Sequence, residues 1–268
     1  MQLSLSMLGT GNALVNECYN TCFVIRSESG NILIDTGGGN YILHQLKRVN
    51  LDLQEIHDIF ITHSHIDHLL GLIWIIRISA QRMNKNNFDG DINIYSHDKV
   101  LELIIELADK LLLPYQAGFI GERIHLIKID NHESRKIAGL DFTFFDIGSN
   151  RTKQFGFCMK YDSSKKLTCC GDEPCKKSSE IYVNNSDWLL HEAFCLYSQA
   201  DKFKPYEKNH STVKDASELA ERLHVKNLLL YHTEDENLSQ RKELYTQEAK
   251  KYFTGKIFIP DDLETITL

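Results

Sequence analysis

The stretch IFITHSHIDHLLGL, residues 59–72, places three histidines and one aspartate within six consecutive positions. Alternate residues of an extended segment point to the same side, so His63 and His65 can bind one metal ion together. Asp67 and His68 follow where the chain turns into a helix, and they can face a second ion. Imidazole nitrogen suits zinc, and it also suits iron or manganese where carboxylates join it. The stretch therefore predicts a metal site where a buried strand ends.

The sequence on either side of this stretch alternates short apolar strands with amphipathic helices. Apolar runs bounded by turn residues indicate strands, and a 3.6-residue apolar period indicates helices. We predict strands over residues 3–8, 21–27, 31–39, 56–63, 91–97, 123–129, 140–148, 155–162, 165–172, 187–194, 226–233 and 256–260, with a turn at 163–165. We predict helices over residues 41–50, 69–83, 99–113, 212–225 (capped by Thr212) and 239–252. The two halves are similar, which favours one domain, residues 1–268, of two sheets between helices.

Composition restricts the class of protein. The net charge of -7 argues against a generally basic surface for nucleic acid. No apolar run approaches the roughly 20 residues of a membrane span, and residues 1–16 lack the regions of a signal peptide. The seven cysteines form no regular framework. These features predict a cytoplasmic protein, without a membrane segment, whose thiols are reduced.

Polar residues stand where five predicted strands end: Asp35, His63, Asp172, Glu192 and His232. Each one alone reads as a cap or turn residue. Together with the histidine-rich stretch they suggest a site, because functional loops lie at strand ends. A carboxylate shared by two ions is a natural bridge, and Asp172 in CCGDEPC could supply it. His232, directly after NLLLY, could complete the shell of the second ion.

The segment THSHIDHLLGL resembles the signature of the metallo-β-lactamase superfamily. Further matches follow in the family's order: LGTGNA, ILIDTGGG, CCGDEPC, LLHEAF and HSTVKDASELAERLHVKNLLLYHT. The motifs GTGNA, LLHEAF and NHST are similar to those of the tRNase Z-like phosphodiesterase branch. The resemblance spans nearly the whole chain. It implies an α/β fold, an αββα four-layer sandwich of two mixed sheets flanked by helices, with a two-metal site at one edge.

The resemblance also implies a role for each site residue. It implies the metal ligands His63 and His65 for the first ion, Asp67, His68 and His232 for the second, and Asp172 as the bridge. Asp35 would orient these ligands without touching the ions. Asp67 would also orient or deprotonate the attacking water. His210, steadied by Glu192, would act as the general acid that protonates the leaving oxygen.

The family pattern contains one more histidine for the first ion, and this sequence departs from the pattern there. Our placement within FFDIGSNRTKQFGF, residues 144–157, puts Gly148 at that position. Glycine has no side chain that can bind a metal, whereas Asp146 could substitute if the loop bends. The sequence therefore predicts one or two zinc ions, with manganese or iron as alternatives. A metal-free site would instead indicate a non-catalytic binding protein that keeps the scaffold.

The predicted substrate follows from what the chain lacks. The tRNase Z enzymes carry a protruding arm rich in glycine and basic residues, but residues 97–139 read as a compact helix and strands. This makes tRNA a doubtful substrate, and we predict a metal-dependent hydrolase of a small phosphodiester or nucleotide-like molecule. Hydrolysis of a lactone or thioester is the alternative reaction. Arg151 and Lys153 could bind a substrate phosphate or lie in a solvated turn, and the resemblance makes a homodimer plausible.

Overall fold

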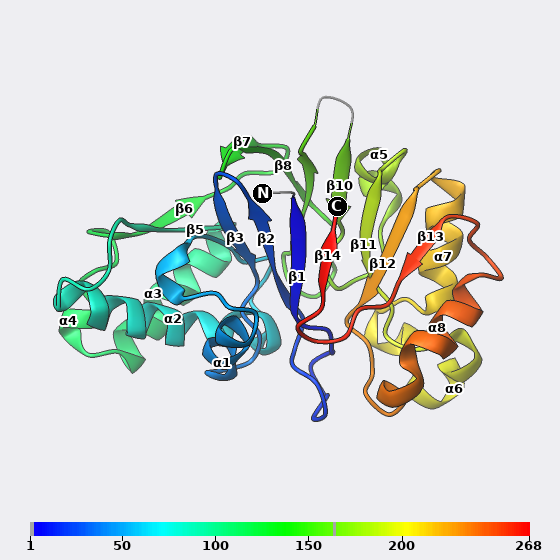
Figure 1. Cartoon of the computed structure of the whole chain (residues 1–268), viewed down its shortest axis with the longest axis horizontal. Helices are drawn as coiled ribbons and strands as arrows, with labels where there is room; N and C mark the ends of the chain where they lie inside the picture. The colour runs from blue at the N-terminus through cyan, green and yellow to red at the C-terminus, as the bar shows by residue number, and fades with distance from the viewer. Residues whose placement is uncertain (1–2, 163–164) are drawn as a thin grey trace.

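Two seven-stranded sheets pack face to face, and helices cover the outer face of each (Figure 1). This computed structural model describes residues 3–162 and 165–268. The arrangement confirms the predicted αββα sandwich of two mixed sheets. Part of the predicted turn at residues 163–165 lies outside the described residues.

The first sheet is built from the N-terminal half of the chain and one C-terminal strand. Its order is β14-β1-β2-β3-β4-β5-β6, and β3 to β6 run parallel. The strands are β1 (Ser4–Gly9), β2 (Cys22–Ser27), β3 (Gly30–Ile34), β4 (Ile56–Phe60), β5 (Ile92–Ser96), β6 (Ile124–Lys128) and β14 (Thr265–Thr267). The predicted strand at 56–63 ends early, so the two leading histidines lie in the loop after β4.

The second sheet has the order β13-β12-β11-β10-β9-β8-β7, and β10 to β13 run parallel. Its strands are β7 (Ser134–Ile137), β8 (Leu140–Asp146), β9 (Phe155–Lys160), β10 (Lys166–Cys169), β11 (Trp188–Glu192), β12 (Asn227–Tyr231) and β13 (Lys256–Phe258). The sequence analysis missed the edge strands β7 and β14. Both are short and mostly polar, as exposed edge strands tend to be, so they carry little apolar signal.

Helices α1 (Tyr41–Arg48), α2 (Ile66–Asn84), α3 (Asp98–Leu111) and α4 (Pro114–Ala117) cover the first sheet (Figure 1). Helices α5 (Glu180–Val183), α6 (Ala200–Phe203), α7 (Val213–Arg222) and α8 (Arg241–Ala249) lie on the other side. Helix α7 begins as predicted, because the side chain of Thr212 accepts a hydrogen bond from the backbone N–H of Asp215. Helix α2 begins three residues earlier than predicted, which places Asp67 and His68 in its first turn.

The space between the sheets is filled by aromatic and aliphatic side chains. Phe60 from β4 packs on Phe144 and Phe157 from the facing sheet, with ring centroids 4.8 and 5.9 Å apart. Further apolar clusters lie between each sheet and its helices. This core fixes both sets of parallel strands, so the loops that follow them emerge at one edge of the sandwich. None of the helices among the described residues is long and apolar enough to cross a membrane.

Candidate metal centre

The loops at this edge bring the predicted site residues together. Asp35 follows β3, His63 follows β4, Asp172 follows β10, Glu192 ends β11 and His232 follows β12. Three groups have their possible ligand atoms within 4.8 Å of one another: His63, His65 and Asp172; Asp67, His68 and His232; and Glu192, His210 and His232. The first two groups have the membership that the sequence analysis assigned to two ions.

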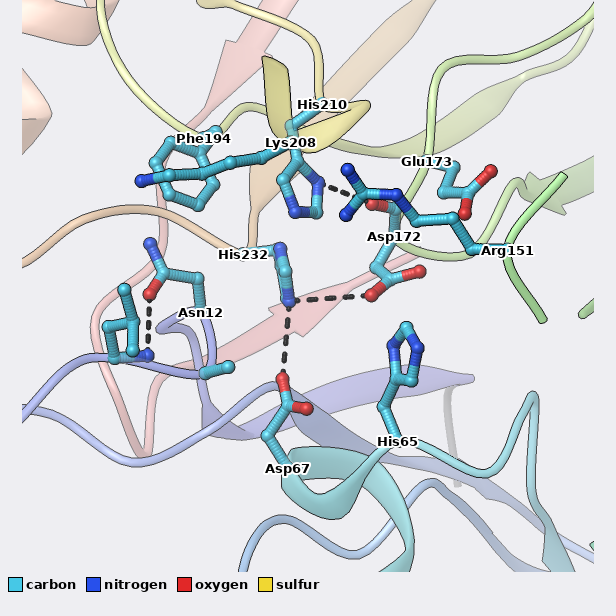
Figure 2. A pocket seen from close by; sticks show the side chains of 12 residues that line it. Asn12, His65, Asp67, Arg151, Asp172, Glu173, Phe194, Lys208, His210 and His232 are labelled. Carbon is cyan, nitrogen blue, oxygen red and sulfur yellow. Dashed lines mark hydrogen bonds and ion pairs between the residues drawn. The ribbon is translucent and has the colours of Figure 1, made fainter. Parts of the chain in front are cut away.

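Asp172 lies at the centre of this cluster. Its Oδ2 is 3.4 Å from Nε2 of His63, 3.5 Å from Nε2 of His68 and 3.7 Å from Nε2 of His232. Oδ2 of Asp67 lies 3.3 Å from Nε2 of His68 and 3.5 Å from Nε2 of His232. Figure 2 shows Asp67 and Asp172 pointing toward the same nitrogen of His232. One oxygen of Asp172 thus faces both groups, as a bridging ligand would.

The Nε2 atoms of three imidazoles in the cluster have no hydrogen-bond partner among the residues that the structure describes. Those of His63, His68 and His232 are all buried. A buried polar atom without a partner is costly, and native structures rarely tolerate it without a function. Imidazole nitrogens and carboxylate oxygens that converge in this way are the usual donors to zinc. The residues present therefore fit a metal ion in each of the first two groups.

Electrostatics keeps the carboxylates of the cluster ionised. Burial opposes the charge on Asp172, but the attraction of His63 and His68 outweighs it and holds the pKa of this carboxyl well below its usual range. Burial likewise opposes the charge on Asp67, and His68 together with His232 lowers the pKa of that carboxyl. Both groups are therefore anionic at neutral pH and available to bind a cation.

Asp35 orients the cluster from behind. Its Oδ2 accepts hydrogen bonds from Nδ1 of His68 at 2.7 Å and from Oγ1 of Thr62 at 2.8 Å, and its Oδ1 accepts from the backbone N–H of Thr62. Oγ1 of Thr62 also lies 2.9 Å from Nδ1 of His63. With Nδ1 of His68 engaged, Nε2 of that ring is turned toward the ligand cluster. Asp35 and His232 have φ angles of +53° and +58°, so this edge also holds backbone strain of a kind common at functional sites.

The loop that lacks the expected histidine turns tightly at Gly148. Gly148 has a φ of +72°, and its N–H is donated to Oδ1 of Asp146 at 2.7 Å. Asp146 belongs to none of the three groups, because its carboxylate closes this turn. Substitution by Asp146 stays a prediction, and in this structure its carboxylate is used in the turn. Gln154, which the sequence analysis missed, is the residue of this loop that approaches the cluster. Its Nε2 donates to Oδ1 of Asp172 and lies 2.8 Å from Nδ1 of His63.

His210 and Glu192 lie on the far side of His232. Nδ1 of His210 donates to the backbone carbonyl of Asp172 at 2.8 Å, and the ring stacks on Phe194 with centroids 4.8 Å apart. Oε2 of Glu192 is 3.7 Å from the same nitrogen, and Oε1 accepts from the backbone N–H of Ser211. The main chain therefore holds the imidazole more directly than Glu192 does. Burial lowers the pKa of His210 to about 4 and raises the pKa of Glu192 well above its usual value.

A pocket of about 210 Å³ opens over the cluster. Its lining residues are Asn12, Ala13, Leu14, His65, Asp67, Arg151, Asp172, Glu173, Phe194, Lys208, His210 and His232. Nη2 of Arg151 donates to the backbone carbonyl of Glu207, and Figure 2 shows its side chain reaching across toward His210. Nζ of Lys208 lies 4.6 Å from the centre of the Phe194 ring. Lys153 instead pairs with Asp98 at 2.7 Å, away from the pocket.

Lys208 and Glu173 were not predicted from the sequence. Nothing in the sequence distinguishes Lys208 from neighbouring surface lysines, because its place depends on the loop that precedes α7. Glu173 follows Asp172 directly, and its Oε1 accepts a hydrogen bond from Ser149 at 2.7 Å. Its other oxygen is buried without a partner among the described residues. The sequence signal that could have identified Glu173 was its position directly after Asp172, the predicted bridging ligand.

Comparison with known proteins gives the family. The model of the family described as Anti-Pycsar protein Apyc1 matches residues 3–254. The chain belongs to this Apyc1 family. Among curated proteins, Ribonuclease Z of Thermococcus sibiricus is 28% identical to this Apyc1-family chain, and the match covers 99% of the chain and 96% of the relative. Ribonuclease Z of Streptococcus gordonii is 24% identical over 99% of the chain and 100% of the relative.

Solved structures confirm the fold of this Apyc1-family protein. The metallo-β-lactamase fold protein YhfI from Bacillus subtilis superimposes with a TM-score of 0.80 at 17% identity, covering 99% of each chain. The short form of human tRNase Z gives 0.73 at 21% identity over 98% of each chain. A diphosphatase of the PhnP family gives 0.73 at 18% identity over 99% of this chain and 97% of that one. The chain therefore has the metallo-β-lactamase fold, and its similarity to the Ribonuclease Z proteins agrees with the branch that its motifs predicted.

Proposed function

We propose that this member of the Apyc1 family is a metal-dependent phosphodiesterase that hydrolyses a small, nucleotide-like phosphodiester. The observation that carries the proposal is the position of Asp172, whose Oδ2 lies within 3.7 Å of three buried Nε2 atoms. None of the three has a hydrogen-bond partner in the described part of the chain. The names of the relatives, Ribonuclease Z among them, support a phosphodiester as the scissile group.

Zinc is the cofactor that the donor set suits best, with manganese or iron as alternatives. The first group would hold one ion through His63, His65 and Asp172, and the second would hold another through Asp67, His68, His232 and the same Asp172. The first ion would then have three protein ligands, the usual number in a catalytic zinc site, and the second would have four. When bound, such ions make water nucleophilic near neutral pH and polarise the phosphoryl group.

His210 is the residue proposed to move the proton. With a pKa of about 4 the ring is neutral at pH 7, and Nδ1 carries its hydrogen toward the carbonyl of Asp172. Nε2 is therefore free to take up a proton from solvent and to pass it to the leaving oxygen, so that the ring begins and ends neutral. Asp67 would orient the attacking water or take its proton, because the attacking and leaving oxygens of an in-line displacement lie on opposite sides of the phosphorus. Proton transfer of this kind is typically worth about 10² to 10⁴ in rate.

Two cations favour an anionic substrate. Arg151 and Lys208 line the pocket, and neither forms an ion pair with a carboxylate in the part of the chain that the structure describes. Phosphate oxygens would supply the missing partner, and a guanidinium can bind them through two parallel hydrogen bonds. Leu14 is 73% exposed at the pocket, where it offers an apolar surface to the rest of the substrate. A substrate in which an apolar ring is joined to a phosphodiester would match both the two cations and the apolar surface of Leu14.

The size of the substrate follows from the pocket and its surroundings. The pocket over the cluster has a volume of about 210 Å³, which suits a small phosphodiester group. The segment between β5 and β7 folds into α3, α4 and β6 against the first sheet, where a tRNA-binding arm would need to protrude. The net charge of -7 also disfavours a polyanion. These features argue against tRNA.

Turnover of a substrate panel tests the proposal. The zinc-loaded and manganese-loaded protein would be assayed with bis(p-nitrophenyl) phosphate, nucleoside cyclic phosphates, p-nitrophenyl phosphate, a precursor tRNA, a lactone and a thioester. We expect turnover of the small diesters alone. Hydrolysis of only the lactone or thioester would replace the proposed reaction. If no substrate reacted with either metal, the protein would be a binding protein instead.

We also propose a homodimer, from the family resemblance, and a cytoplasmic location. All seven cysteines are free, as expected in a reducing compartment. Light scattering coupled to gel filtration tests the dimer, and a mass of one chain would refute it. Fractionation of cells that express the protein tests the location.

A further inference from the structure

Gln154 contacts two residues of the first ligand group from a buried position. It is the last residue before β9 and is 1% exposed. Its Nε2 donates a hydrogen bond to Oδ1 of Asp172 and lies 2.8 Å from Nδ1 of His63. It reaches both from the side that faces away from Nε2 of His63. Gln154 is therefore placed to hold ligands rather than to bind an ion itself.

We propose that Gln154 is the positioning residue of the shared carboxylate. A carboxylate can rotate about its terminal bond, which is softly restrained and roughly two-fold. The amide of Gln154 engages Oδ1 of Asp172, and this leaves Oδ2 directed at the nitrogens of His63, His68 and His232. The loop that lacks a histidine ligand thus contributes to the metal centre through the orientation of Asp172. This inference rests on the metal centre of the proposed function.

The environment of the amide supports a role beyond packing. Its oxygen, Oε1, is buried and has no hydrogen-bond partner among the described residues. A buried amide that served the fold alone would be expected to satisfy both ends. Turning the amide over would bring this oxygen against the Asp172 carboxylate, where two acceptors repel. The carboxylate of Asp172 therefore sets the orientation of the Gln154 amide, and the amide oxygen is left without a partner among the described residues.

The neighbouring backbone also makes room for this side chain. Gly171, directly before Asp172, has a φ of +79°, and a Cβ at this position would lie 3.0 Å from Oε1 and from Cδ of Gln154. Any larger residue would therefore crowd the amide. In the loaded site, Nδ1 of His63 would carry a hydrogen and donate it to Oγ1 of Thr62, 2.9 Å away. Nε2 of Gln154 and this N–H are then both donors and form no hydrogen bond with each other, so the bond to Asp172 is the polar interaction that remains for Gln154.

Zinc binding to variants of the full chain tests this inference. Gln154→Met keeps the length of the side chain and removes the donor, and Gln154→Asn keeps the amide but is too short to reach Asp172. Gln116→Met is the matched control, because Gln116 is also 1% exposed but lies in α4, where its Oε1 accepts from the backbone of Leu113. Thermal unfolding of the metal-free proteins would show which variants fold.

Calorimetric titration with zinc, and the absorption spectrum of the cobalt(II) form, would then be compared. We expect both Gln154 variants to bind zinc about 10- to 100-fold more weakly, the range seen when residues that orient metal ligands are removed. We also expect a changed cobalt spectrum, whereas Gln116→Met keeps the affinity and spectrum of the unaltered chain. Unchanged affinity in a folded Gln154 variant would overturn this inference alone. Failure of the unaltered chain to bind zinc or cobalt would overturn the metal centre and this inference with it.

Discussion

Oδ2 of Asp35 lies 2.7 Å from Nδ1 of His68, and both side chains are buried. This contact links β3, which Asp35 follows, to the first turn of α2, which carries His68. It presents Nε2 of the imidazole to the carboxylates of Asp67 and Asp172. The carboxylates also raise the pKa of His68 well above its usual value, although burial opposes this. In the metal-free chain the protonated ring of His68 thus supplies the positive charge that faces these carboxylates.

Asp35→Asn is expected to weaken zinc binding by about 10- to 100-fold, because the amide holds His68 less firmly than the carboxylate does. Calorimetric titration of the metal-free variant would measure the change. Asp58→Asn is the matched control. Asp58 accepts a hydrogen bond from Tyr95 at 2.9 Å but belongs to none of the three ligand groups. Equal affinities in the two variants would show that Asp35 does not orient a ligand.

Removal of single ligands is expected to separate the two ions. His65→Ala should leave one zinc per chain, because His65 belongs to the first group alone. Asp172→Ala should lower the zinc content further, because its Oδ2 faces both groups. Elemental analysis of chelator-free preparations gives the count. One ion per chain in Asp172→Ala would show that the carboxylate is not shared.

Chelation is expected to lower the stability of the unaltered chain. Within the described residues, the buried Nε2 atoms of His63, His68 and His232 have no hydrogen-bond partner, and a bound ion would take that place. A ligand present at 100 times its dissociation constant stabilises the folded state by about 2.7 kcal/mol. Urea unfolding with and without a chelator would show the difference as a shift of the midpoint. Asp172→Ala should show a smaller shift, and a chelator effect of the same size in that variant would point to a metal bound elsewhere.

Arg151→Ala is expected to raise KM about tenfold or more, since hydrogen bonds to charged groups contribute about 1.5–3 kcal/mol. Initial-rate kinetics on a small diester would measure KM and kcat. Lys153→Ala is the control from the same loop, because Lys153 pairs with Asp98 and not with the pocket. The role of Arg151 is refuted if the two variants share the same KM.

His97 is expected to make the fold less stable as the pH falls. Burial, followed by the charge of Lys153, lowers the pKa of His97 from 6.5 to about 4. The unfolded chain therefore takes up a proton below pH 6.5 that the folded chain does not accept until about pH 4. The stability that comes from the neutral ring is present above pH 6.5 and is lost between these two values.

Urea unfolding of the metal-free protein at pH 7 and pH 5 tests this linkage. His97→Leu should lose less stability between the two pH values than the unaltered chain does. His44→Leu, at an exposed position on α1, is the control and should behave like the unaltered chain. The linkage would be disproved if His97→Leu showed the same pH dependence as the unaltered chain.

The long, strongly periodic elements were predictable from the sequence. The apolar run before His63 had to be a buried strand, and the amphipathic segment after Thr212 had to be a helix. Strands that alternate with helices lead to parallel neighbours, and parallel strands end at one edge. Asp35, Asp172 and His232 could therefore be placed near one another before any distance was known.

The contribution of the loop between β8 and β9 could not be predicted in this way. Its sequence offers Asp146, Arg151, Lys153 and Gln154 within nine residues. In the structure Asp146 closes a turn, Lys153 faces Asp98, and Arg151 and Gln154 reach the pocket and the ligands. An irregular loop has no period, so nothing local decides which side chain turns inward.

The sequence by itself determined the fold, the edge that carries the site and the donors that converge there, because strand and helix periods are local properties of the chain. Only the tertiary structure decided how these donors are held. Gln154 engages Asp172 across 18 positions of sequence, and Arg151 is tied to the carbonyl of Glu207 across 56. Such contacts depend on how two loops pack at the end of a finished core, and that packing is set by the whole chain.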